Sequence, residues 1–103
     1  MKYLKRFEDI ADESIFLNIN RTKEFIYSGG DINSIVSDEN DTPLLIASFH
    51  HKLDVVIELI KCGANWNSVN DYGHNFLDYL DSEEKIIISK EFPDIINVIK
   101  YNL

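Results

Sequence analysis

"TPLLIASFHHKLDVVIELIKCGANWN", residues 42–67, has the pattern of two short helices joined by a tight turn. Thr42 can cap the free amides at a helix start, and Pro43 suits a first helical position, where no backbone amide is needed. These two residues predict a helix that runs to about Phe49. A tight turn at residues 50–52 is expected to follow it.

A second helix is predicted at residues 53–61, where apolar residues recur at helical spacing. The residues on its apolar face are Val55, Val56, Leu59 and Ile60. Gly63 is expected to end this helix, because glycine readily adopts the left-handed conformation that a helix end often needs. The predicted unit is therefore a helix pair with an apolar face.

Parts of this helix pair recur along the chain at a nearly constant spacing. Three pairs of segments match: SGGDIN at 28–33 with CGANWN at 62–67, NINRTKEFI at 18–26 with KLDVVIELI at 52–60, and SDENDTPLL at 37–45 with NDYGHNFLD at 70–78. A fixed period of this order is typical of proteins that stack one structural unit on the next. The sequence therefore predicts a stack of helix pairs.

Together, the motifs TPLLIA, DVVIELI, CGANWN and NDYGHN resemble the ankyrin repeat. In that family each repeat of about 33 residues forms a β-turn and two antiparallel helices. The resemblance implies an all-α fold, an ankyrin-repeat solenoid of stacked antiparallel helix pairs with β-turn tips. We expect a single domain over residues 1–103, with an N-terminal capping repeat at about 7–36, a central repeat at 37–69 and a C-terminal capping repeat at 70–103.

The C-terminal quarter carries helix signals of its own. Asp81 and Glu84 have the spacing of a capping box, which predicts a helix over about residues 83–91. Pro93 can begin another helix, so the last repeat is either an ordinary capping repeat or one with an extra helix. The residues expected to be buried are Ile86, Ile87, Ile88 and Phe92 beside the first helix, and Ile95, Ile96 and Ile99 in the second.

Trp66 has a structural and a functional interpretation. Tryptophan is prominent in binding hot spots, yet large aromatic side chains are mostly buried. By the resemblance, Trp66 and its counterpart Ile32 stand where the family places a residue that packs between repeats. We therefore expect Trp66 to belong to the core.

The family binds proteins through its β-turn tips and the exposed side of each first helix, so the resemblance implies a binding surface at those positions. The residues there are Asp38, Glu39, Asp41, Asp71, Tyr72 and His74 in the turns, and Phe49, His50, Ser82 and Glu83 on the helices. Carboxylates would attract a cationic surface and aromatic side chains would anchor it. The alternative is that these residues are only solvated turns.

Two histidines of this set add a conditional prediction. If both His50 and His74 approach a carboxylate, binding should change between about pH 6 and 7, where histidine titrates. Asn40 stands where a turn glycine is usual in the family, and asparagine tolerates the left-handed conformation.

The charge balance restricts the partner. Eighteen acidic residues against ten basic ones give a formal net charge of −8, which would repel nucleic-acid phosphates and anionic membrane surfaces. A basic protein surface is therefore the expected partner. Cys62, as a lone cysteine, cannot form an internal disulfide, and no apolar run approaches the length that a membrane span needs, so we expect a cytoplasmic protein. We also expect it to be monomeric when free.

The sequence gives weak support for a catalytic, metal-binding or phosphate-binding site. His50 and His51 with Asp54 are candidate metal ligands, but adjacent histidines point in different directions and no further cluster completes a shell. Cys62 follows a predicted helix, where the dipole disfavours a thiolate nucleophile. The SGGD motif at 28–31 lacks the lysine of a phosphate-binding loop. We expect no cofactor, no metal and no enzymatic activity.

The sequence thus predicts a small protein-binding module. Its most specific form is an acidic inhibitor or immunity-type protein that covers a basic surface of a toxin or a nucleic-acid-handling enzyme. A generic adaptor or host-interaction scaffold is the alternative of the same class. Alternatives of other classes are a metal-dependent enzyme that uses His50, His51 and Asp54, and a structural subunit that docks through the C-terminal helix.

Overall fold

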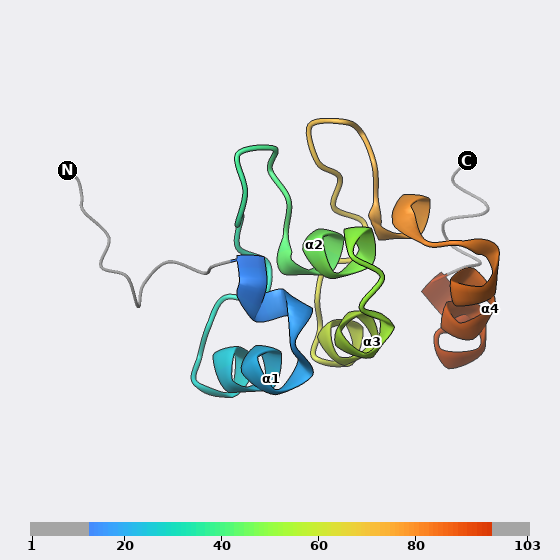
Figure 1. Cartoon of the computed structure of the whole chain (residues 1–103). Helices are drawn as coiled ribbons and strands as arrows, with labels where there is room; N and C mark the ends of the chain where they lie inside the picture. Colours follow the sequence, from blue (N-terminus) through green and yellow to red (C-terminus); the bar gives the residue numbers. More distant parts are fainter. Residues whose placement is uncertain (1–12, 96–103) are drawn as a thin grey trace.

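The computed structural model describes residues 13–95 of the chain, and Figure 1 shows these residues as a row of short helices with two long loops on one side. The described residues form helices and turns, with no β-strand among them. The helices, in chain order, are the 3-10 helix η2 (Glu13–Leu17), α1 (Ile19–Tyr27), α2 (Pro43–Phe49), α3 (Leu53–Lys61), the 3-10 helix η3 (Phe76–Tyr79) and α4 (Ser82–Glu91). None of them is long and apolar enough to cross a membrane.

Helix pairs stack in the predicted manner. The central helix α2 packs between η2 and η3, while α3 packs between α1 and α4. The first helices of the three pairs therefore form one layer and the second helices form the other, which confirms the all-α stack (Figure 1). The predicted repeat boundaries after residues 36 and 69 fall in the two long loops, and the predicted start at residue 7 lies outside the described residues.

The ends of the central helices follow from local sequence, as predicted. The hydroxyl of Thr42 accepts a hydrogen bond from the backbone amide of Leu45 at 3.4 Å, and Pro43 is the first residue of α2. Gly63 follows α3 with a φ of 96°, in the left-handed region that glycine favours. His51 adopts a φ of 59° in the turn between the helices, a conformation that glycine would adopt more easily.

The core lies between the two helix layers. Every residue of α2 except Phe49 is buried, and the predicted apolar face of α3 is buried as well. Phe16 of η2 and Phe76 of η3 are fully buried on either side of the central pair. Trp66 and Ile32 are partly buried and pack against this core, as predicted.

The burial of isoleucine residues in α4 differs from the prediction. The capping box of Asp81 and Glu84 is present, but Ile86 and Ile87 are 54% and 42% exposed, so the prediction that both are buried was wrong. Ile88 is the fully buried residue of α4. The physical reason is that, among the described residues, α4 packs onto α3 without a further helix pair on its outer side.

The chain beyond α4 is described only as far as residue 95. Residues 93–95 are helical, and Phe92 and Ile95 pack into the core as predicted. The predictions for Ile96 and Ile99 fall outside the described residues.

Candidate functional site

A groove of about 360 Å³ opens at the junction between the central and last helix pairs. Its walls come from η2, α2, η3 and the turns at the ends of both long loops. We call these turns the first tip (residues 37–41) and the second tip (residues 70–74). The residues that line the groove are Glu13, Glu39, Asp41, Ile46, Phe49, His50, Tyr72 and Tyr79.

The groove brings together half of the predicted partner-binding residues. The predicted residues that line it are Glu39, Asp41, Phe49, His50 and Tyr72. Three lining residues were not predicted: Glu13, Ile46 and Tyr79. Ile46 and Tyr79 lie one repeat apart at equivalent places in α2 and η3, and this position of the repeat was not among the predicted binding positions.

Aromatic rings form one side of the groove. The Phe49 and Tyr79 rings meet at right angles with centroids 5.4 Å apart, and the His50 ring stands at a similar angle to Phe49 at 5.1 Å. Phe49 and Tyr72 are 57% and 67% exposed, which is unusual for such large side chains. The groove therefore presents aromatic surface directly to solvent.

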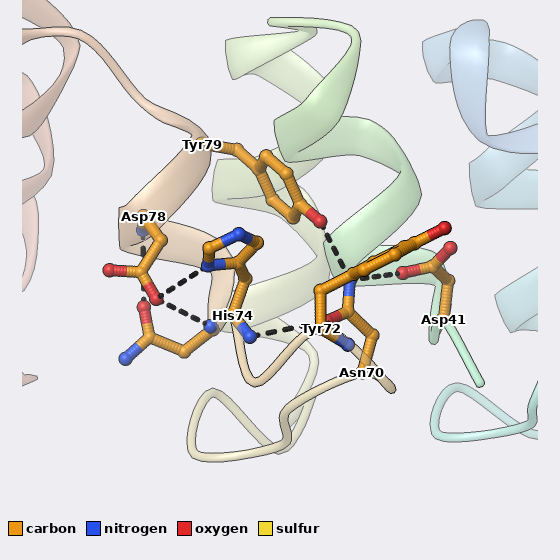
Figure 2. Close-up of polar contacts among 7 residues, drawn as sticks. Asp41, Asn70, Tyr72, His74, Asp78 and Tyr79 are labelled. Atoms are coloured by element: carbon orange, nitrogen blue, oxygen red, sulfur yellow. Dashed lines mark hydrogen bonds and ion pairs between the residues drawn. The ribbon is translucent and has the colours of Figure 1, made fainter. Parts of the chain in front are cut away.

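Asn70, which sequence reasoning missed, holds the second tip onto the groove. Only 5% of this residue is exposed. As Figure 2 shows, its amide nitrogen donates to Asp41 Oδ1 at 2.9 Å and to the Tyr79 hydroxyl at 2.7 Å. Its side-chain oxygen accepts hydrogen bonds from the backbone amides of Tyr72 at 3.0 Å and His74 at 3.1 Å. One buried side chain thus fixes four residues around the groove.

Ser37 has the corresponding place in the first tip, one repeat earlier. Its hydroxyl accepts hydrogen bonds from the backbone amides of Glu39 and Asp41 and donates to Asp41 Oδ2 at 2.9 Å. Because Asn70 donates to the other oxygen of the same carboxylate, Asp41 is held from both tips. The recurrence of a turn-forming side chain at 37 and 70 is a signal that the sequence contains.

Direct hydrogen bonds tie the two tips together. The side-chain nitrogen of Asn40 donates to Asp71 Oδ1 at 2.6 Å, and the backbone amide of Asp71 donates to the carbonyl of Glu39 at 2.9 Å. Asn40 has a φ of 65°, so it takes the left-handed conformation that was predicted at this turn position. The tips therefore form a joined edge above the groove.

The other predicted site residues lie away from the groove lining. Asp38 and Asp71 are exposed in the tips, and His74 contacts the Tyr79 ring from the second tip. Ser82 and Glu83 occupy the first turn of α4, because η3 is shorter than α2 and α4 begins less than one repeat after the start of α3. The constant shift that was used to place them therefore overshot the first helix.

The histidine condition is met in one place. His74 Nδ1 lies 3.7 Å from Asp78 Oδ2, so this histidine does approach a carboxylate (Figure 2). His50 packs on the Phe49 ring and has no carboxylate partner within residues 13–95. The prediction of a pH-dependent change required both histidines to approach a carboxylate. Among the described residues, only His74 does so, and the condition is therefore not met for both histidines.

Possible metal ligands gather at a different place from the one that was hypothesised. Within the described part of the chain, ligand atoms of His51, Asp81 and Glu84 lie within 4.8 Å of one another, whereas His50 and Asp54 belong to no such group. Glu84 Oε1 contacts His51 Nδ1 at 2.8 Å and also accepts the backbone amide of Asp81. The group thus acts as a cap for α4 and a link from α4 to the α2–α3 turn.

Cys62 directly follows α3 and does not line the groove. Partial desolvation, together with a hydrogen bond from its sulfur to Glu58 Oε2 at 3.4 Å, raises the pKa of the thiol above its ordinary value of 9.0. The hydroxyl of Tyr27 donates to the same carboxylate oxygen at 3.1 Å, and this bond raises the pKa of Tyr27. A thiol that stays protonated is a poor nucleophile, in agreement with the sequence-based interpretation.

Comparison with known proteins supports the resemblance. Residues 39–71 match the family model described as the ankyrin repeat, which supports assignment to the ankyrin-repeat family. A search of the curated proteins finds no match. The matched segment runs from the first tip through α2 and α3 into the second tip, so it contains the central helix pair. Ankyrin repeats are typically non-enzymatic modules that bind other proteins, which suggests a protein-interaction role for this chain.

Proposed function

We propose that this protein binds a partner protein with a basic surface across the groove and the two tips. The observation that carries the proposal is the meeting of acidic and aromatic residues from three successive repeats in one groove. The residues are Glu13, Glu39, Asp41, Phe49, Tyr72 and Tyr79. In its most specific form, the protein is an inhibitor or immunity-type protein that covers the basic surface on which its partner's activity depends.

Charge and aromatic surface have separate roles in this proposal. The carboxylates of the groove and tips attract a cationic surface over a distance and increase the rate of association. Phe49 and Tyr72 lose exposed apolar surface in the complex, and aromatic residues of this kind are frequent hot spots. The acidic residues thus govern association, while the aromatic residues govern dissociation.

The hydrogen bonds between the tips support a binding role because they order the surface in advance. Asn70 holds Asp41 and Tyr79 through hydrogen bonds of 2.9 and 2.7 Å. Asn40 joins the first tip to Asp71 of the second. An ordered surface loses less conformational entropy when it binds than a flexible loop does.

Affinity capture from cells that naturally make the protein tests this proposal. The bait is the full chain, as wild type and as the groove variant with Phe49→Ala and Tyr72→Ala. A matched control replaces Ile35 and Val69 by alanine, since these side chains are 56% and 54% exposed and do not line the groove. A partner retained by the control and lost by the groove variant is expected; a partner captured equally by both variants contradicts the proposed site.

The captured partner then separates inhibition from recruitment. Its own activity is assayed alone and with an excess of this protein. Loss of activity supports the inhibitor form of the proposal, whereas unchanged activity assigns the protein to the adaptor class. Slower association after Glu39→Lys, most clearly at low salt, is expected in both cases because charge attraction precedes contact.

A further inference from the structure

We propose that the groove receives one lysine or arginine side chain of the partner, held between aromatic rings and carboxylates. This inference rests on the proposed binding function and names the chemistry of the contact. Its components are the rings of Phe49, Tyr72 and Tyr79 and the carboxylates of Glu13, Glu39 and Asp41.

The groove has an excess of negative charge. Three of its eight lining residues carry carboxylates, and none is a lysine or arginine. Glu13 and Glu39 are exposed and have no hydrogen-bond or ion-pair partner for their carboxylates within the described part of the chain. Asp41 is half-buried, and the groups that bind its two oxygens, Ser37 and Asn70, are neutral. A cationic side chain would supply the charge that the groove lacks.

The aromatic side of the groove suits the same ligand. A lysine or arginine head within about 6 Å of an aromatic ring centroid is attracted by the negative face of the ring. Tyr79 is held in place by the hydrogen bond that its hydroxyl accepts from Asn70 at 2.7 Å, and Phe49 packs against the Tyr79 ring. Two rings are thus ordered before a ligand arrives, while Tyr72 is the most exposed of the three.

The size and the apolar floor of the groove favour a side chain with a long stem. At about 360 Å³, the groove is near the lower end of the range of about 300–1,000 Å³ that is typical of ligand pockets. Ile46 is buried at the groove and offers apolar surface to the methylene stem of a lysine or arginine. The charged head can then lie beside the carboxylates while the stem covers Ile46.

Small capped amino acids test the inference without knowledge of the partner. The probes are N-acetyl-arginine methylamide, N-acetyl-lysine methylamide and, as a neutral match, N-acetyl-norleucine methylamide. Each is titrated at constant ionic strength into the isotope-labelled full chain while backbone amide resonances are followed. We expect saturable shifts at residues 37–41, 49–50 and 70–74 with at least one cationic probe, and weaker or no shifts there with the norleucine probe.

Variants identify the groups that hold the probe. Glu39→Gln removes a charge and keeps the shape of the side chain, and it should weaken binding of the cationic probe by about two- to fivefold. Tyr72→Ala should weaken it by a similar factor, about two- to fivefold, through loss of the cation–π contact. Glu83→Gln and Tyr27→Ala are the matched controls, because both side chains are exposed and neither lines the groove; they should leave the affinity unchanged.

The outcome separates this inference from the proposed function. Equal shifts with the cationic and neutral probes, or unchanged affinity after both Glu39→Gln and Tyr72→Ala, would overturn the cation-binding groove. If partner capture still depends on Phe49 and Tyr72 in that case, the proposed binding surface stands and only its chemistry is wrong. If capture is also independent of these residues, both statements are wrong.

Discussion

The central helix pair and the last helix pair descend from the same repeated pattern, yet they bury their residues very differently. In the central pair, six of the seven residues of α2 and four residues of α3 are buried. In the last pair, η3 buries Phe76 and Leu77, and α4 buries only Ile88. Helix pairs packed on both sides, rather than composition alone, therefore decide which apolar residues become core.

The proposed binding groove lies where these two unlike pairs meet. The central pair contributes a rigid first helix that ends in Phe49, and the shorter η3 of the last pair places Tyr79 beside it at 5.4 Å. Their tips are joined through Asn40, Asp71 and Asn70. Because η2 also contributes to its lining, the groove is a product of successive helix pairs, and no single pair would form it alone.

Truncation of core side chains should show the largest difference between the two pairs. Leu59→Ala in α3 removes a fully buried side chain and should lower the free energy of unfolding by about 2–5 kcal/mol. Ile86→Ala in α4 removes a side chain that is 54% exposed and should change it by about 0.5 kcal/mol or less. Urea denaturation followed by circular dichroism measures both. Similar losses in the two variants would break the comparison.

The junction should respond to loss of its buried polar residue with an intermediate effect. Asn70→Ala leaves the Tyr79 hydroxyl and one oxygen of Asp41 without this donor, and it should lower the free energy of unfolding by about 1–3 kcal/mol. Ser37→Ala is the matched change in the first tip and should cost about 1 kcal/mol, since Ser37 is less buried and its bonds stay within its own tip. If Ser37→Ala proves the more costly variant, the linking role of Asn70 is wrong.

The smallest expected effect concerns the reactivity of the Cys62 thiol, at the end of α3 in the central pair. Because the pKa of Cys62 is raised, its thiol stays protonated below the ordinary value of 9.0, so alkylation by iodoacetamide at pH 8 should be slower than in the urea-unfolded chain. Glu58→Gln removes the negative charge beside the sulfur and should increase the rate a few-fold by lowering the pKa. An unchanged alkylation rate in this variant would contradict the influence of Glu58.

The raised pKa of Cys62 also determines how this thiol changes the stability of the fold with pH. Since the folded-state pKa of Cys62 lies above the unfolded value, the protonated thiol is favoured by folding. Its stabilising contribution is complete below the ordinary pKa of 9.0 and is lost as the pH rises through the higher folded value. No loss of stability is expected from this group between pH 6 and 8.

The sequence predicted the central pair well because its signals are local. Thr42, Pro43 and Gly63 act within one turn of the helices that they begin or end, and the apolar face of α3 follows from its own period. The burial of α4 could not be predicted in this way. Three successive isoleucines look alike in sequence, and only the position of α3 selects Ile88 from among them.

Part of the groove lining was among the predicted binding residues, because the repeat spacing is also a local signal. Glu39, Asp41, Phe49, His50 and Tyr72 followed from repeat positions that keep a constant spacing. The repeat spacing put Ser82 and Glu83 on a first helix, whereas they begin α4, as the capping box at residues 81–84 indicates. The recurrence of a turn-forming side chain at 37 and 70 could have marked Asn70 as a turn residue, but its hydrogen bond to Asp41 in the preceding tip is visible only after folding.

The backbone amides that a bound partner protects show whether the groove and the two tips form the binding surface. Hydrogen–deuterium exchange of the full chain, free and in complex with the captured partner, reports which backbone amides become protected. The account predicts new protection at the two tips and at the end of α2, with α1 and the outer side of α4 unchanged. Protection confined to α1, α3 or α4, with both tips exchanging as in the free protein, would contradict it.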